Sequence, residues 1–367
     1  MGHERSRIAR MPIPTAGRSH FAEVFHWSRE SRITGRRALI GVLGMAVPVA
    51  VGVWLGRPAL GYVIGLGTML LAGEQGDRGT GKHGSVLMSL VPVVLAIAVA
   101  LGLSSLPFAD VLMVALAMLA ATLVNYSRPF AVAGIRFIVF LVLNLGIVGA
   151  HGPNGRGAAL LFGVGAAWRV LLRTVARFTS RKAEAGDHVP SPATREPTPS
   201  QRRAHMKRVL RTLPGWQYPL RLAFGLAVAC LMRDAWPAHH FDWMVLSIVL
   251  LTPRALEHFP VHITQRAVGT LAGVVVAGII MACAPGHLAI AVLVCLFGAA
   301  APLVRPGNYA AYCVLATPLI LLAMDAGTGI APTMLADRLV ATLAGCAIVL
   351  GANGLMDCVL RWALQTE

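Results

Sequence analysis

The chain has 367 residues, of which 56% are hydrophobic and only 13% are charged, and its formal net charge is +16. A soluble domain carries about 25% charged residues, so this composition excludes an ordinary water-soluble protein and indicates a membrane protein. The positive charge is concentrated in the N-terminal tail and between Arg169 and Arg211. Basic residues beside membrane helices are typical of the cytoplasmic face and its anionic lipids, so we expect no nucleic-acid partner.

Residues 1–37 form a basic tail that lacks the apolar run and cleavage site of a secretory signal, so we expect the tail to be retained in the cytoplasm. A first transmembrane repeat is expected over 38–177. Apolar windows separated by Gly- and Pro-rich turns predict its helices. These lie at about 38–55, 58–73, 86–103, 108–125, 131–149 and 157–177.

Residues 178–217 are predicted to form a cytoplasmic linker, because Ser180–Ser200 is rich in Pro, Ser, Thr and charge. Its last part, 201–213, has apolar residues on one face and basic residues on the other. This pattern predicts an amphipathic helix at the membrane surface, or an extension of the next helix. A second repeat is expected over 218–362, with helices at about 218–233, 241–255, 267–284, 287–303, 309–324 and 333–361.

The two sets of helices carry matching residues at a nearly constant distance. Arg37 recurs as Arg221 (221 − 37 = 184), Asn125 as Asn308 (308 − 125 = 183) and Arg156 as Arg338 (338 − 156 = 182). The predicted fold class is therefore an all-α polytopic membrane protein, with about twelve transmembrane helices in two tandem repeats. Loop charge favours cytoplasmic termini, which requires an even helix count and gives both repeats the same orientation.

Several residues in or beside these helices attract attention. Gly269 and Gly273 are four apart, which indicates close helix packing. Arg266 is expected among lipid headgroups, and Trp243 and Tyr309 fit an interfacial belt or a surface for stacking on an aromatic ring. The six cysteines show no metal-ligand spacing, so no metal and no cofactor is expected.

Arginines inside apolar spans are the candidates for binding an anion. Charge there is costly and usually faces the bundle interior or an aqueous cavity. Arg338 either forms a locking pair with Asp337 or offers its guanidinium to a carboxylate, for which its geometry is suited. Arg136 either snorkels to the cytoplasmic face or joins that site, and Arg156 is the repeat partner of Arg338.

Histidine changes charge near neutral pH, so residues that could carry a proton during transport form a second group. These are Asp337, His240 and His262, although histidines in loops are more often inert.

The second half resembles a known family in an ordered series of motifs. These are Asp242-Trp243, Pro253, Gln265–Gly273, Asn308-Tyr309-Ala310, Thr317 and Asp337–Gly345. The series is similar to the fusaric-acid-resistance protein-like (FUSC) family of integral membrane transporters, which includes bacterial exporters of aromatic carboxylic acids. It is distantly similar to the plant aluminium-activated malate transporters. The resemblance covers about Arg221–Gly351 and reaches the first half only through the repeat.

The resemblance and the charged residues together predict a non-enzymatic exporter of small organic anions, with aromatic carboxylic acids as the expected substrates. We expect it in the cell inner membrane, working by alternating access with optional proton coupling. A passive organic-anion channel and a non-transporting membrane scaffold are the alternatives. The partners are then the anion and the lipid bilayer, and a homo-oligomer is compatible with the sequence.

Overall fold

The computed structural model describes residues 22, 24–28, 34–71, 82–181, 198–254, 261–325 and 332–365. These residues form helices and contain no strand, which confirms the all-helical prediction. The helices of the first half are α3 (Gly35–Trp54), α4 (Pro58–Leu70), α5 (Lys82–Leu103), α6 (Ala109–Leu123) and α7 (Arg128–Arg181). They are followed by α8 (Pro199–Leu210), α9 (Leu213–Ala235), α10 (Asp242–Leu251), α11 (Val261–Ala282), α12 (His287–Val304), α13 (Tyr309–Asp325) and α14 (Pro332–Gln365).

Among the described residues, six helical segments are long and apolar enough to cross a bilayer, which supports the prediction of a multi-pass membrane protein. They are Gly35–Trp54, Arg128–Gly149, Gly155–Arg177, Val261–Ala282, His287–Val304 and Thr333–Ala363. Large apolar side chains are exposed on several of these segments, for example Val164 at 52%, Leu288 at 73% and Trp362 at 67%. A surface of this kind suits contact with lipid rather than with water.

The chain reverses direction within α7. A side chain at Gly155 would meet the carbonyl oxygen of Ile147 at 2.5 Å. In a straight helix these residues, eight positions apart, would be separated by about 12 Å. The two arms of α7 therefore fold back on each other, at the place where the sequence predicts a turn.

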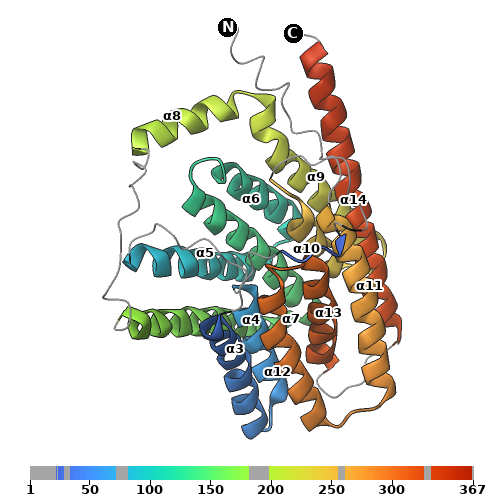
Figure 1. Cartoon of the computed structure of the whole chain (residues 1–367). Coiled ribbons are helices and arrows are strands. Elements are labelled where there is room, and N and C mark those ends of the chain that lie inside the picture. The colour runs from blue at the N-terminus through green and yellow to red at the C-terminus, as the bar shows by residue number, and fades with distance from the viewer. Residues whose placement is uncertain are drawn as a thin grey trace.

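The helix contacts of the two halves correspond to each other. In the first half α3 packs on α4, α5 packs on α7 and α4 packs on α7; in the second half the equivalent pairs are α9 with α10, α11 with α13 and α10 with α14. Several contacts cross between the halves, including those of α10 with α7 and of α4 with α12 and α13. The two most extensive are shown in Figure 1, where α12 lies beside α3 and α6 lies beside α9. The halves thus meet mainly at these two interfaces.

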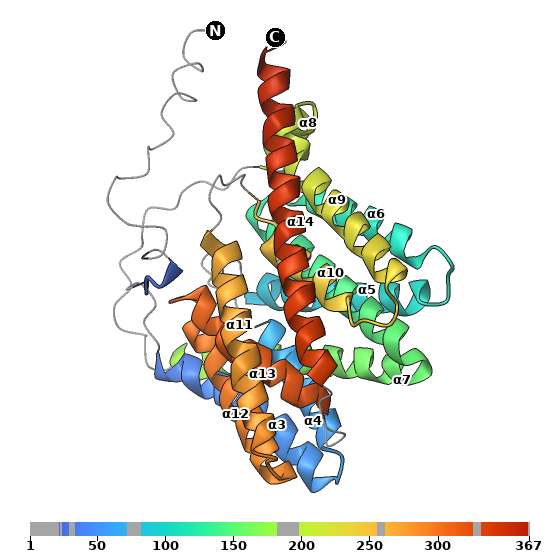
Figure 2. The same cartoon turned by 90° about the vertical axis from the view of Figure 1, so that its right-hand side faces the viewer.

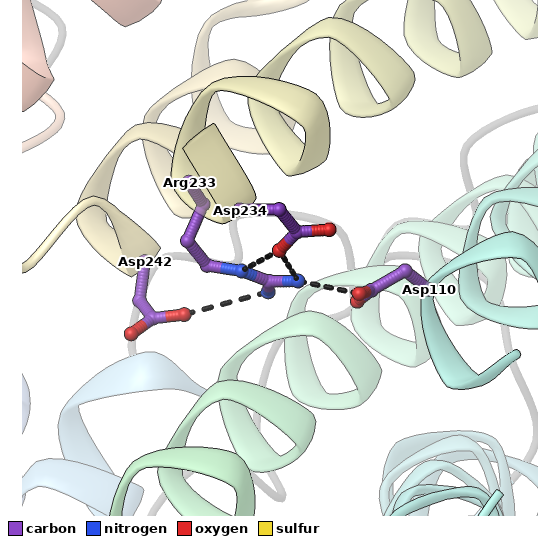
Figure 3. Close-up of polar contacts among 4 residues, drawn as sticks. All are labelled: Asp110, Arg233, Asp234 and Asp242. Atoms are coloured by element: carbon purple, nitrogen blue, oxygen red, sulfur yellow. Dashed lines mark hydrogen bonds and ion pairs between the residues drawn. The ribbon is translucent and has the colours of Figure 1, made fainter. Parts of the chain in front are cut away.

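These two interfaces have different chemistry. Between α3 and α12 the contact is apolar and close, because Met45 fills the space that a side chain at Gly298 would occupy. Between α6 and α9 it includes charge: Arg233 contacts Asp110 at 2.5 Å across the halves (Figure 3). The same guanidinium also contacts Asp234 at 3.2 Å and Asp242 at 3.5 Å. One interface is therefore held by packing, and the other by packing and an ion cluster.

The linker contributes the separate helix α8, which begins with a capping box between Thr198 and Gln201. It packs on α9 at the edge of the molecule (Figure 1). A helix is thus present where the sequence predicts one over 201–213, beginning and ending slightly earlier, while its amphipathic role at the membrane surface stays a prediction. Residues 182–197 of the linker and residues 1–21 of the tail lie outside the described part of the chain.

Candidate anion-binding site

Arg338 lies near the start of α14 and is only 3% exposed. Its guanidinium carbon lies 4.0 Å from the ring centroid of Trp243, at the start of α10, in a cation–π contact. Its buried Nε and Nη1 atoms have no hydrogen-bond partner among the residues that the structure describes. Buried donors are normally satisfied, so these two nitrogens indicate a place where an acceptor would bind.

Asp337 does not neutralise Arg338, contrary to the alternative of a locking pair between the two. Its carboxylate instead contacts the loop between α9 and α10, where Nδ1 of His239 is 2.8 Å from one oxygen and Nδ1 of His240 is 3.1 Å from the other. The backbone N–H of His240 donates to it as well, at 3.2 Å. Successive residues on a helix point in different directions, so Asp337 holds the loop while Arg338 faces inward.

Arg266 is buried, which differs from the expected position among headgroups. It is 4% exposed, and it donates to the hydroxyl of Tyr309 and to the hydroxyl of Ser247, each at 3.1 Å. Its Nε has no hydrogen-bond partner in the described part of the chain. Tyr309 and Ser247 come from α13 and α10, and such distant partners cannot be recognised from the local sequence around Arg266.

Further aromatic rings lie against Tyr309, the hydrogen-bond partner of Arg266. Tyr309 stacks on Tyr312 with centroids 5.6 Å apart and planes 21° apart, and the ring of His262 meets Tyr309 edge-on at 5.6 Å. The guanidinium of Arg305 lies 5.2 Å from the centroid of Tyr312. The cluster therefore combines cationic groups with flat apolar faces.

Gly269 and Gly273 bring α11 close to α13 and so bring Arg266 close to Tyr309. A side chain at Gly269 would lie 2.5 Å from the carbonyl oxygen of Ala310, and one at Gly273 would lie 2.7 Å from Cβ of Thr317. The absence of side chains at both positions permits this close approach of the two backbones.

The first-half candidates lie elsewhere. Arg136 is half-buried on α7 and interacts electrostatically with Arg173 of the same helix. Arg156, the repeat partner of Arg338, is exposed on α7. The contacts described around Arg338 and Arg266 come instead from α10, α13 and α14, so the candidate site belongs to the second half.

Within the described part of the chain, no carboxylate forms an ion pair with Arg266 or Arg338. No group of three or more His, Cys, Asp or Glu side chains there could hold a metal ion. Two buried guanidinium groups close enough to influence each other form a strongly positive site. Such a site favours an anion, and the guanidinium fork suits a carboxylate.

The comparison with protein families matches residues 224–352 to the fusaric acid resistance protein-like family. The chain contains a FUSC domain. The predicted family resemblance is therefore confirmed over a segment that runs from α9 into α14 and includes Arg266, Arg338 and their contacts. Comparisons with curated proteins and with solved structures found no match.

Parts of the site within the FUSC domain were not recognised from sequence. Ser247 accepts a hydrogen bond from Arg266, and Tyr312 stacks on Tyr309. In the sequence, both look like ordinary helix residues. One signal in the sequence indicated the burial of Arg266, because this residue lies just before Gly269 and Gly273. Two glycines that allow close packing of two helices also bring the residues beside them toward the neighbouring helix.

Proposed function

We propose that this FUSC-domain protein exports small organic anions across the membrane, with aromatic carboxylic acids as its substrate class. The observation that supports this proposal most directly is Arg338, which is buried and stacked on Trp243 with two unpartnered nitrogens. A carboxylate accepting from those nitrogens would satisfy donors that are otherwise costly to bury. The rings of Trp243, Tyr309 and Tyr312 would then stack on the substrate ring.

In the proposed arrangement, the chain forms twelve membrane helices as two tandem repeats of the same orientation. The matching helix contacts of the two halves and the residues that recur between them support it. Both termini lie in the cytoplasm and the protein resides in the inner membrane, which the basic loops favour. Alternating access would proceed by movement of the halves at the α3–α12 and α6–α9 interfaces.

Proton coupling is proposed at the contact between Asp337 and the loop between α9 and α10, which contains His239 and His240. Asp337 is adjacent to Arg338, and His240 holds its carboxylate. A change in histidine charge would alter the hold on the start of α14 and hence the position of Arg338. His262 is a weaker candidate, since it lies against Gln265 and Tyr309 at the end of α11.

The test is efflux of radiolabelled benzoate from preloaded cells that express the full chain or a variant. We expect Arg338→Ala to lower the efflux rate at least about thirtyfold, because truncating one partner of a buried charge pair costs about 2–5 kcal/mol. Arg338→Lys should give an intermediate rate, since it keeps the charge but loses the fork. Arg156→Ala, at the exposed repeat position, is the matched control and should export normally.

Efflux by Arg338→Ala at the rate of the unchanged protein would refute this site. The passive-channel alternative is distinguished by recording from the purified protein in a planar bilayer with benzoate as the anion. A carrier gives no unitary currents in this measurement, so currents of channel size would replace the exporter proposal.

A further inference from the structure

A short piece of the N-terminal tail is bound to the second half of the protein. The carbonyl oxygen of Val24 accepts hydrogen bonds from Gln265 Nε2 at 3.0 Å and from Asn308 Nδ2 at 3.1 Å. Asn308 Nδ2 also lies 3.2 Å from the carbonyl oxygen of His26, and the backbone N–H of Ser28 donates to Gly307 at 2.9 Å. Backbone groups of residues 24–28 are thus held by specific partners at the ends of α11, α12 and α13.

Side chains add to this attachment. Val24 is 1% exposed, so its side chain is fully enclosed. The indole of Trp27 lies against Gly307, where an added side chain would come within 2.5 Å of the ring. The tail segment therefore lies in a binding site formed by the side chains of Gln265 and Asn308 and by the backbone at Gly307.

An equivalent arrangement occurs in the first half, which argues against a chance contact. Asn125 is the repeat partner of Asn308, and its Nδ2 donates to the carbonyl oxygen of Gly215 at 3.2 Å. Gly215 lies at the start of α9, the first helix of the second half, just as residues 24–28 precede α3, the first helix of the first half. Asn308 of the second half thus binds the segment that leads into the first half, and Asn125 of the first half binds the segment that leads into the second.

The bound tail segment lies next to the candidate anion site. Gln265 and Asn308, which hold Val24, directly precede Arg266 and Tyr309, which are hydrogen-bonded to each other. Figures 1 and 2 show the short blue segment beside the ends of α11 and α13. We propose that residues 24–28 form a strap that closes this end of the Arg266–Tyr309 site and must leave it before a substrate can reach the site. The role of the strap in substrate access rests on the proposed function, whereas its closure of the site does not.

A natural thiol offers a direct measure of closure. Cys313 is 3% exposed, lies one turn after Tyr309 on α13 and interacts with both Tyr309 and Arg266. In a variant that retains Cys313 alone, the rate of its reaction with a negatively charged methanethiosulfonate reports access to the site without any transport. The other five cysteines would be replaced by serine.

The variant that tests the strap is Asn308→Asp. Its remaining oxygen still caps α13 by accepting from the N–H of Ala311, as Asn308 Oδ1 does at 3.0 Å, but it no longer donates to Val24 and His26. We expect Cys313 to react at least about tenfold faster, as the loss of one or two hydrogen bonds predicts. Asn125→Asp makes the same change in the other turn and is the matched control, for which no acceleration at Cys313 is expected.

A second measurement uses the chain with all its natural cysteines. Limited trypsin digestion of the purified protein should remove the N-terminal tail faster in Asn308→Asp than in Asn125→Asp. Unchanged Cys313 reactivity and unchanged tail cleavage in Asn308→Asp would each refute the strap. Both measurements are independent of benzoate efflux, so a failure of the strap proposal can be distinguished from a failure of the proposed transport function.

Discussion

The two halves of this protein share several helix contacts but differ in which arginines they bury. Where the second half buries Arg338 against Trp243, the first half has the exposed Arg156 and the buried Tyr62. Arg221 is 2% exposed, whereas its partner Arg37 is exposed. Several helix contacts thus correspond between the halves, while at these positions the buried cations, Arg221 and Arg338, belong to the second half.

This difference indicates where function is located. Burying a cation costs several kcal/mol unless hydrogen bonds or opposite charges compensate, so each buried arginine should have a compensating interaction. Arg221 has such partners within the protein: it donates to Asn353 at 2.6 Å, to the carbonyl of Pro253 at 2.8 Å and to the carbonyl of Gln217 at 3.2 Å. Arg338 has unpartnered nitrogens, so its compensation is expected to come from a ligand. The comparison separates Arg221, whose hydrogen bonds are made within the protein, from Arg338, the proposed binding residue.

The largest effect on stability is expected at Arg221. Arg221→Met should lower the free energy of unfolding by about 3 kcal/mol, because it leaves the buried Asn353 and the end of α10 without their donor. Arg37→Met, at the exposed repeat position, should cause no measurable change. Thermal denaturation of the detergent-solubilised protein, followed by size-exclusion chromatography, measures both. Equal losses in the two variants would contradict the assigned difference between the halves.

A smaller effect is expected from the glycine stripe. Gly269→Ala should destabilise the protein by about 1–3 kcal/mol, the usual cost of overpacking, because the new methyl group would meet the backbone of α13. Gly278→Ala on the same helix is the control, since its nearest neighbour would be a Leu335 methyl carbon at 3.9 Å. The same thermal assay applies. If both variants are equally stable, α11 and α13 do not pack as closely as described.

The smallest effect concerns the two interfaces between the halves. Asp110→Asn should lower stability by about 1 kcal/mol at low salt, since it weakens a half-exposed ion contact with Arg233. The difference should shrink in about 1 M NaCl, where charges are screened within a few ångströms. Met45→Leu in the apolar α3–α12 interface is the comparison, and its effect should not depend on salt. A salt-independent Asp110→Asn effect would show that packing dominates at both interfaces.

Most helix boundaries followed from turn residues in the sequence. The predicted helices at 287–303 and 309–324 correspond closely to α12 and α13, because Gly286 and the Arg305–Asn308 turn mark their ends. The predicted helix at 241–255 ends earlier, at Leu251, since Pro253 disfavours helical backbone before it. Helix α11 starts at Val261 instead of 267 because its polar first turns are buried by other elements, which a local apolar window cannot reveal.

The site was predictable only in part. Arg338 and Trp243 could be singled out as a charge and an aromatic residue within apolar spans, but their contact joins residues nearly a hundred positions apart. The pairing of Asp337 with the loop between α9 and α10 and the burial of Arg266 depend equally on how α10, α13 and α14 meet. The sequence can therefore indicate which charged residues are costly to bury. Tertiary structure shows which of them have hydrogen-bond partners that offset this cost.

The length of α14 links the site to the far end of the chain. Its 34 residues span about 51 Å at 1.5 Å per residue, well beyond a bilayer core of about 30 Å. Figure 2 shows its C-terminal end rising past the neighbouring helices. Arg338 and the C-terminal end are about 40 Å apart along one helix. If Arg338 moves during the proposed transport, a tilt of about 5° at the arginine would shift the other end of α14 by about 3–4 Å.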